Sequence, residues 1–206
     1  SNDLNRDKWI KFFNAARQLH LIPIVRLATY PDGETWVRPD ALDLVDFANF
    51  LDDMPWPIKN RYLVLFNEVN QVKEWGGQVD PMAYATLLMD AKRIFKQRSD
   101  DFFLISAGLD MSLDALTFYR QMSQLQPKWY DAVDGIAVHA YPNDRHGIMG
   151  YKYELELLQS LGYVPKPVFV TETSAFGQIW PDQNVVAITP FLLFAGAGDF
   201  AKFSLL

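Results

Sequence analysis

The stretch Tyr62-Leu-Val-Leu-Phe-Asn67-Glu68 decides the fold that the sequence predicts, because an apolar run ends abruptly in an amide and a carboxylate. Pro167-Val-Phe-Val-Thr171-Glu172 repeats this form, and Asp134-Gly-Ile-Ala-Val-His139-Ala-Tyr141 ends in an imidazole and a phenol. Continuous apolar runs are typical of parallel strands covered on both faces. In a parallel barrel the carboxyl ends of the strands meet on the face that binds ligands. The three runs therefore predict polar side chains gathered at the mouth of a barrel.

Outward from these runs, short apolar segments alternate with stretches of helical spacing. We expect strands at residues 22–28, 62–66, 102–106, 135–139, 168–171 and 200–205. We expect helices over residues 9–19, 44–51, 84–94, 113–122, 155–161 and 185–194. Asp80-Pro81 predicts the start of the third helix and Gly162 the end of the fifth. The alternation predicts an α/β protein, and since no glycine-rich phosphate loop follows a strand, a (β/α)₈ TIM barrel is favoured over an open doubly wound sheet.

Composition excludes several classes of function. The 206 residues fit a single domain, 1–206, and the formal net charge of -6 argues against a nucleic-acid partner. The absence of cysteine excludes disulfides and thiolate catalysis. No apolar run is long enough to span a bilayer, so we expect a soluble protein without a membrane partner. No signal peptide is recognisable at Ser1-Asn2-Asp3; if the protein is secreted, its signal is absent from this sequence.

The two strand-end glutamates suit glycoside hydrolysis. One carboxyl group protonates the leaving oxygen while the other attacks the anomeric carbon and forms a covalent glycosyl-enzyme. A retaining mechanism needs the two carboxyl groups about 5–5.5 Å apart, whereas an inverting one needs roughly 6.5–9.5 Å. We therefore expect Glu68 and Glu172 to be the catalytic pair.

The chain resembles the clan A retaining glycoside hydrolases, in which an Asn precedes the acid/base Glu, as Asn67 precedes Glu68 here. The stretch Phe66-Asn-Glu-Val-Asn70, with Trp75-Gly-Gly after it, is similar to the Trp-Asn-Glu-Pro-Asn region of the xylosidase–iduronidase family, although Val69 stands in place of proline. The resemblance implies that Glu68 is the acid/base after strand four, that Glu172 is the nucleophile after strand seven, and that Asn67 binds the sugar 2-hydroxyl. It also implies that His139 and Tyr141 line the catalytic subsite, with Tyr141 hydrogen-bonded to the nucleophile.

Four further residues are predicted to bind substrate. Asn70 belongs to the same motif. Arg26 lies inside an apolar strand, where an arginine needs a partner. It either forms a structural ion pair within the barrel or binds a carboxylate of the site as a clamp. Trp75 and Trp180 follow the two glutamate strands, and each either stacks on sugar or anchors its own loop.

The alignment of Glu68 with strand four makes residues 22–28 strand three, so strands one and two are missing. We therefore expect an incomplete barrel in which strands three to eight are visible. An incomplete barrel exposes two strand edges, which we expect a homodimer or a segment preceding residue 1 to cover.

Three functions remain open from the sequence. The first is retaining hydrolysis of a β-linked oligo- or polysaccharide, without metal or cofactor. The second is a non-catalytic carbohydrate-binding barrel or inactive hydrolase relative. The third is a metal-dependent sugar isomerase or lyase with oxygen and nitrogen ligands from Glu68, Asp110, His139 and Glu172.

Overall fold

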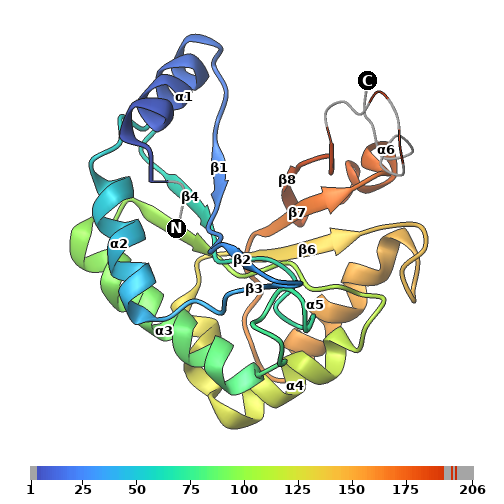
Figure 1. The fold of residues 1–206 in the computed structure, drawn as a ribbon. Helices are drawn as coiled ribbons and strands as arrows, with labels where there is room; N and C mark the ends of the chain where they lie inside the picture. The colour runs from blue at the N-terminus through green and yellow to red at the C-terminus, as the bar shows by residue number, and fades with distance from the viewer. Residues whose placement is uncertain (1–3, 193–195, 197, 199–206) are drawn as a thin grey trace.

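Six parallel strands form the centre of the molecule in the computed structural model, which describes residues 4–192, 196 and 198 (Figure 1). One sheet has the order β1-β4-β5, with bounds Ile24–Arg26, Arg61–Val64 and Phe102–Ile105. A second sheet has the order β6-β7-β8, with bounds Ile136–Ala140, Val168–Thr173 and Val185–Ile188. A parallel bridge between Ile105 and Gly135 joins the two sheets. The predicted α/β alternation and parallel pairing are confirmed.

Five longer helices lie on the outer side of the strands (Figure 1). They are α1 (Arg6–Gln18), α2 (Ala41–Asp52), α3 (Pro81–Arg98), α4 (Ala115–Leu125) and α5 (Tyr151–Ser160). Asp80 caps α3 as predicted, because its side chain accepts a hydrogen bond from the backbone N–H of Ala83 at 2.9 Å. Of the described helices, none has the length and apolar character needed to cross a membrane.

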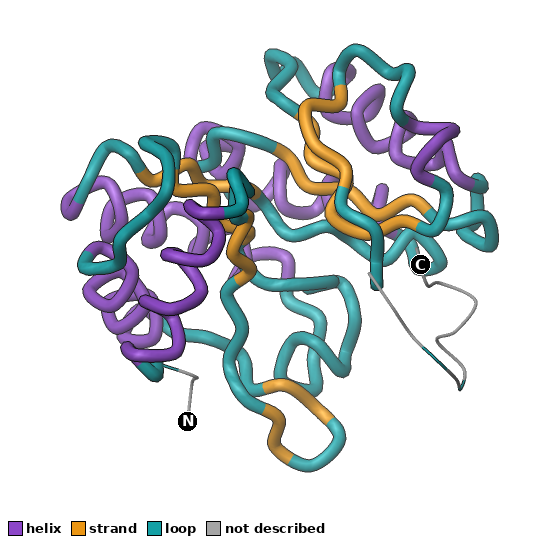
Figure 2. Tube along the Cα trace, turned by 90° about the horizontal axis from the view of Figure 1, so that it is seen from above, coloured by secondary structure: helices purple, strands orange, loops and turns teal. Residues whose placement is uncertain are grey.

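Short elements occupy the connections. The hairpin β2–β3 (Pro31–Asp32 and Thr35–Trp36) projects from the loop after β1 (Figure 2). The 3₁₀ turns η1 (Pro127–Ala132) and η2 (Ile148–Gly150) precede β6 and α5. Between β7 and β8 there is only the single turn α6 (Phe176–Ile179).

Alternate residues of the strands face two separate cores. Val64, Ile105, Ala137 and Phe169 form the buried cluster inside the sheets, with Tyr62 and Phe103 packed against them. The rings of Tyr62, Phe103 and Phe169 lie 5.1–5.8 Å apart, centroid to centroid. The intervening strand residues join the larger core beneath the helices. Burial of each such side chain contributes about 1.5–3 kcal/mol, so this two-sided packing fixes the strand register.

The prediction of a helix over residues 185–194 is wrong at its start. Val185–Ile188 is strand β8, which pairs in parallel with β7 through Val168–Val185, Phe169–Ala187 and Val170–Ile188. A short apolar run does not distinguish a strand from a buried helix by its period, and the β-branched residues Val185, Val186 and Ile188 favour the strand. The strand predicted at 200–205 lies outside the described residues. Among the described strands, β1 pairs only with β4 and β8 only with β7.

Candidate active site

Glu68 and Glu172 come together at the carboxyl ends of β4 and β7. One oxygen of each carboxylate and one ring nitrogen of His139 all lie within 4.8 Å of one another. The glutamate side chains are 18 % and 13 % exposed, so both reach solvent while remaining held by the protein. The sequence placed these three residues on different strands, and the fold joins them in one group.

His139 lies between the two carboxylates. Its Nδ1 is 2.9 Å from Glu68 Oε1, and its Nε2 is 3.9 Å from Glu172 Oε1. A register shift after Val138 places His139, rather than Ala140, opposite Glu172 on β7. Such bulges change the direction of side chains beside active sites. The bulge therefore helps to bring the imidazole, which is buried, to both glutamates.

Two more donors hold Glu172. Arg26 Nη1, at the end of β1, lies 3.1 Å from Glu172 Oε1, and the Tyr141 hydroxyl donates to Glu172 Oε2 at 2.9 Å. Burial, together with the negative charge of Glu172, raises the pKa of Tyr141, so the phenol stays a donor. The contact expected between Tyr141 and Glu172 is present. Of the two interpretations of Arg26, the clamp on a site carboxylate matches this geometry.

The amide of Asn67 extends this network toward a third carboxylate. Asn67 Oδ1 accepts a hydrogen bond from Arg26 Nη1 at 2.9 Å. Its side chain also bonds to Glu74, a half-buried residue that the sequence did not single out. Burial raises the pKa of Glu74, the bond with Asn67 opposes that rise, and the nearby charge of Glu68 adds to it. Glu74 lies in the loop after β4, where no strand-end pattern marks it.

The backbone at the end of β4 is strained. Phe66 and Glu68 have φ values of 73° and 37°, a region that residues with a side chain rarely adopt. The Glu68 N–H donates to the Gly108 carbonyl at 3.0 Å, which ties this turn to the loop after β5. Strained residues of this kind cluster at functional sites, where the surrounding structure holds them in place.

Two of the predicted substrate-binding residues have structural roles instead. Both polar atoms of the Asn70 amide are used on the Asp110 backbone, at 2.9 Å to its carbonyl and 3.0 Å from its N–H. Trp75 is 1 % exposed and packs edge-on against Phe66 and Tyr84, so its face is not open to a sugar. Trp75 anchors its own loop, which was the alternative interpretation of this residue.

Trp180 is 67 % exposed and stacks on Phe176 at the end of α6. Its ring face is therefore accessible, and its role as a sugar platform stays a prediction.

Three polar residues around Glu68, namely Gln71, Asp110 and Asp144, were not predicted as parts of a sugar site. Gln71 Nε2 donates to Glu68 Oε2 at 2.5 Å and to Asp110 Oδ2 at 2.8 Å. Asp144 accepts from the Tyr141 backbone N–H at 2.8 Å, and burial raises its pKa. All three lie in loops beyond strand ends, where only the three-dimensional arrangement reveals their partners.

The group of Glu68, His139 and Glu172 offers nitrogen and oxygen donors of a kind that bind divalent cations. However, Arg26 already places a positive charge 3.1 Å from Glu172 Oε1. A metal ion at this position would meet like-charge repulsion from the guanidinium, so the donor set fits a metal poorly.

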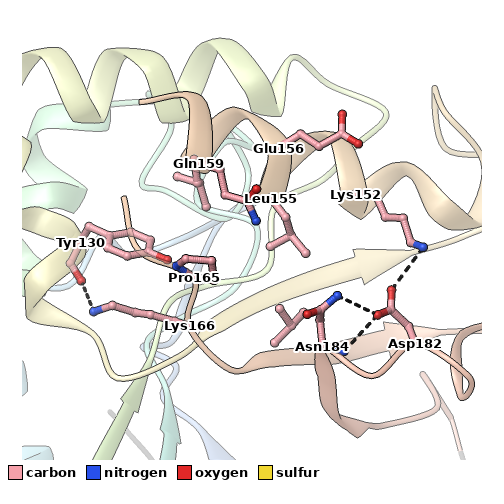
Figure 3. Close-up of a pocket in the computed structure, with 11 residues that line it drawn as sticks. Tyr130, Lys152, Leu155, Glu156, Gln159, Pro165, Lys166, Asp182 and Asn184 are labelled. Atoms are coloured by element: carbon pink, nitrogen blue, oxygen red, sulfur yellow. Dashed lines mark hydrogen bonds and ion pairs between the residues drawn. The ribbon is translucent and has the colours of Figure 1, made fainter. Parts of the chain in front are cut away.

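A separate cavity of about 170 Å³ lies beside α5, away from the two glutamates (Figure 3). Several of its charged groups are engaged within the protein: Lys152 lies 3.4 Å from Asp182, and Lys166 donates to the Tyr130 carbonyl at 2.7 Å. Asn184 also donates to Asp182, at 3.1 Å. Lys152, Lys166, Asp182 and Asn184 are therefore already engaged within the protein.

Comparisons with known proteins find no family model and no curated protein that matches the sequence. Solved structures do match. A monomeric β-xylosidase from Caulobacter crescentus CB15 superposes with a TM-score of 0.65 at 13% identity, covering 91% of this chain and 49% of that chain. The GH39 enzyme from Xanthomonas axonopodis pv. citri gives 0.62 at 14% identity, covering 90% and 46%. The mannohexaose complex of a Thermomonospora fusca β-mannanase gives 0.63 at 12% identity, covering 98% and 68%.

This chain thus spans about half the length of the xylosidase and GH39 chains that it matches. At these identities the likeness concerns the fold. The course of the backbone is therefore similar to part of the α/β barrels of these glycoside hydrolases, and the chain has a partial fold of that kind.

Proposed function

We propose that this protein hydrolyses β-glycosidic bonds with retention of configuration. The observation that carries the proposal is the closeness of Glu68 and Glu172, since one carboxylate oxygen of each lies within 4.8 Å of the other. Such closeness favours the spacing of about 5–5.5 Å between carboxyl groups in retaining enzymes over the roughly 6.5–9.5 Å of inverting ones.

In the proposed reaction Glu172 attacks the anomeric carbon while Glu68 protonates the leaving oxygen. Glu68 then takes a proton from the water that hydrolyses the glycosyl-enzyme. Arg26 and Tyr141 hold the two oxygens of Glu172, so that the carboxylate is oriented for attack. Asn67 lies beside Arg26, where its amide would bind the sugar 2-hydroxyl.

The substrate that we propose is a neutral β-linked oligo- or polysaccharide. The basic side chains described at this site, Arg26 and His139, are both engaged with the two carboxylates. The similar structures are named as a β-xylosidase and a β-mannanase, so their sugars are the first to test.

The test uses Glu68→Gln and Glu172→Gln with 4-nitrophenyl β-D-xyloside, β-D-mannoside and β-D-galactoside. Removal of the acid/base is expected to lower activity by about 10²- to 10⁴-fold. Removal of the nucleophile is expected to lower it further. Proton NMR of the first-formed sugar should show the β-anomer. Full activity of both variants, or a first-formed α-anomer, would overturn the proposal.

Two other functions give different results. A non-catalytic sugar-binding barrel would bind glycans in calorimetry and turn over no substrate. A metal-dependent isomerase or lyase would lose activity in excess chelator, whereas the proposed hydrolase would keep it.

We further propose that residues 1–206 form one domain in which β1 and β4–β8 correspond to strands three to eight of a barrel. A second copy of the chain, or a segment preceding residue 1, would then cover the open edges of β1 and β8. Analytical ultracentrifugation of the chain distinguishes a dimer from a monomer.

A further inference from the structure

The side chain of Gln71 bridges two carboxylates. Its Nε2 donates to Glu68 Oε2 at 2.5 Å and to Asp110 Oδ2 at 2.8 Å. A primary amide has two N–H groups, so each carboxylate receives one of them. Bonds of this kind to a charged acceptor are shorter and stronger than bonds between neutral groups.

Asp110 is a fixed anchor for this bridge. Its backbone N–H and carbonyl are both bonded to the Asn70 amide, at 3.0 and 2.9 Å. Its other carboxylate oxygen, Oδ1, accepts from the Ser112 N–H at 2.8 Å. Because these groups of Asp110 are all hydrogen-bonded, Asp110 fixes the Gln71 side chain to the loop after β5.

Glu68 is consequently held at both carboxylate oxygens from two directions. Oε1 contacts His139 on β6 at 2.9 Å, and Oε2 contacts Gln71 at 2.5 Å. The backbone of Glu68 is itself in the left-handed region, with φ at 37°, so the side chain starts from an unfavourable geometry that its partners must maintain.

We propose that Gln71, anchored by Asp110, is the positioning residue of the Glu68 acid/base carboxyl. This rests on the function proposed above. An amide N–H bonds to a carboxylate and also to the carbonyl oxygen of a carboxylic acid. The same contact therefore orients Glu68 both when it donates a proton to the leaving group and when it accepts one from water.

The first test compares Gln71→Met with Gln78→Met, an exposed position in the same loop. A phenyl leaving group needs a proton, whereas 2,4-dinitrophenyl does not. We expect Gln71→Met to lower kcat/KM for the phenyl glycoside about tenfold more than for the dinitrophenyl glycoside of the same sugar, since a misplaced acid affects only the first. Azide should restore part of the kcat for the dinitrophenyl substrate. Gln78→Met should behave as the wild type.

A purely structural role of Gln71 would lower both rates equally, and that result would overturn the inference. Equal loss in Gln71→Met and Gln78→Met would do the same.

A second measurement does not depend on turnover. We expect the Gln71 side-chain amide signals in ¹H–¹⁵N NMR, assigned with Gln71→Met, to shift in Glu68→Ala and in Asp110→Ala, while the Gln78 signals stay in place. Unmoved Gln71 signals would overturn the inference. If the wild type hydrolyses no glycoside, the proposed function fails, and this measurement still decides whether Gln71 bridges the two carboxylates.

Discussion

His139 depends on the absence of a side chain at Gly108. A Cβ at that position would lie 2.4 Å from His139 Cδ2 and 2.5 Å from its Nε2, far closer than atoms can approach. The imidazole that contacts Glu68 and approaches Glu172 therefore sits directly against bare backbone. Glycine is needed at position 108 because it lets the imidazole approach the backbone closely, and not because of its φ angle.

Gly108→Ala is expected to displace His139 and lower kcat/KM about 10- to 100-fold, because small misplacements of catalytic groups are costly. The measurement is steady-state kinetics together with thermal unfolding, so that loss of folded protein is separated from loss of rate. Gly177→Ala is the matched control, since a Cβ there meets nothing within 4 Å. A Gly108→Ala enzyme as active as the control would contradict the role given to His139.

The sequence predicts the residues at strand ends better than those in loops. Glu68, His139, Tyr141 and Glu172 were predicted because a polar group at the end of an apolar strand stands out. Arg26 was predicted because a charge inside such a strand needs a partner. Gln71 and Glu74 carry no such contrast, since polar residues are ordinary in loops. For Trp75 the sequence left two interpretations open, because burial of the ring depends on Phe66 and Tyr84, which sequence spacing does not bring together.

At the scale of elements, helices α4 and α5 pack around an unusual carboxyl group. Glu154 on α5 is fully buried, and neither of its oxygens has a hydrogen-bond partner within the described residues. Burial raises its pKa well above the ordinary value, the neighbouring Tyr119 side chain opposes that rise, and the charge of Asp144 adds to it. The folded protein therefore holds Glu154 protonated at pH values where the unfolded chain releases that proton.

The raised pKa of Glu154 determines how the free energy of unfolding changes with pH. The folded state binds the extra proton, so the free energy of unfolding falls as pH rises from the ordinary Glu range through the raised pKa. Glu154→Gln should remove this contribution, so that its urea-unfolding free energy falls less than that of the wild type between pH 5 and pH 8. Parallel pH dependences of the two proteins would contradict the assignment.

The strands and helices were predictable where pattern and length agreed. The helical stripes of α1 to α5 are long enough to show their period, and Asp80-Pro81 marks a start. The run at Val185–Ile188 was misassigned because four apolar residues fit either a strand or a helix, and only pairing with β7 decides between them. The two-residue strands of the β2–β3 hairpin are too short to carry a pattern.

At the scale of the whole molecule, the outer edges of β1 and β8, which pair with no further described strand, should govern association. Val186 on β8 is 58 % exposed, and lysine on an edge strand opposes pairing with another chain. We expect Val186→Lys to weaken self-association of the chain in analytical ultracentrifugation. Val72→Lys, at a position 52 % exposed in the loop after β4, serves as the control. Equal association of both variants would place the contact elsewhere.

The two three-stranded sheets meet at the parallel bridge between Ile105 and Gly135. The β1-β4-β5 sheet and its following loops carry Arg26 and Glu68, and the β6-β7-β8 sheet carries His139 and Glu172. The contacts Arg26–Glu172 and His139–Glu68 therefore both connect one sheet with the other. Each of these two contacts ties one sheet to the other, so together they hold the carboxyl separation on which the proposed retaining mechanism depends.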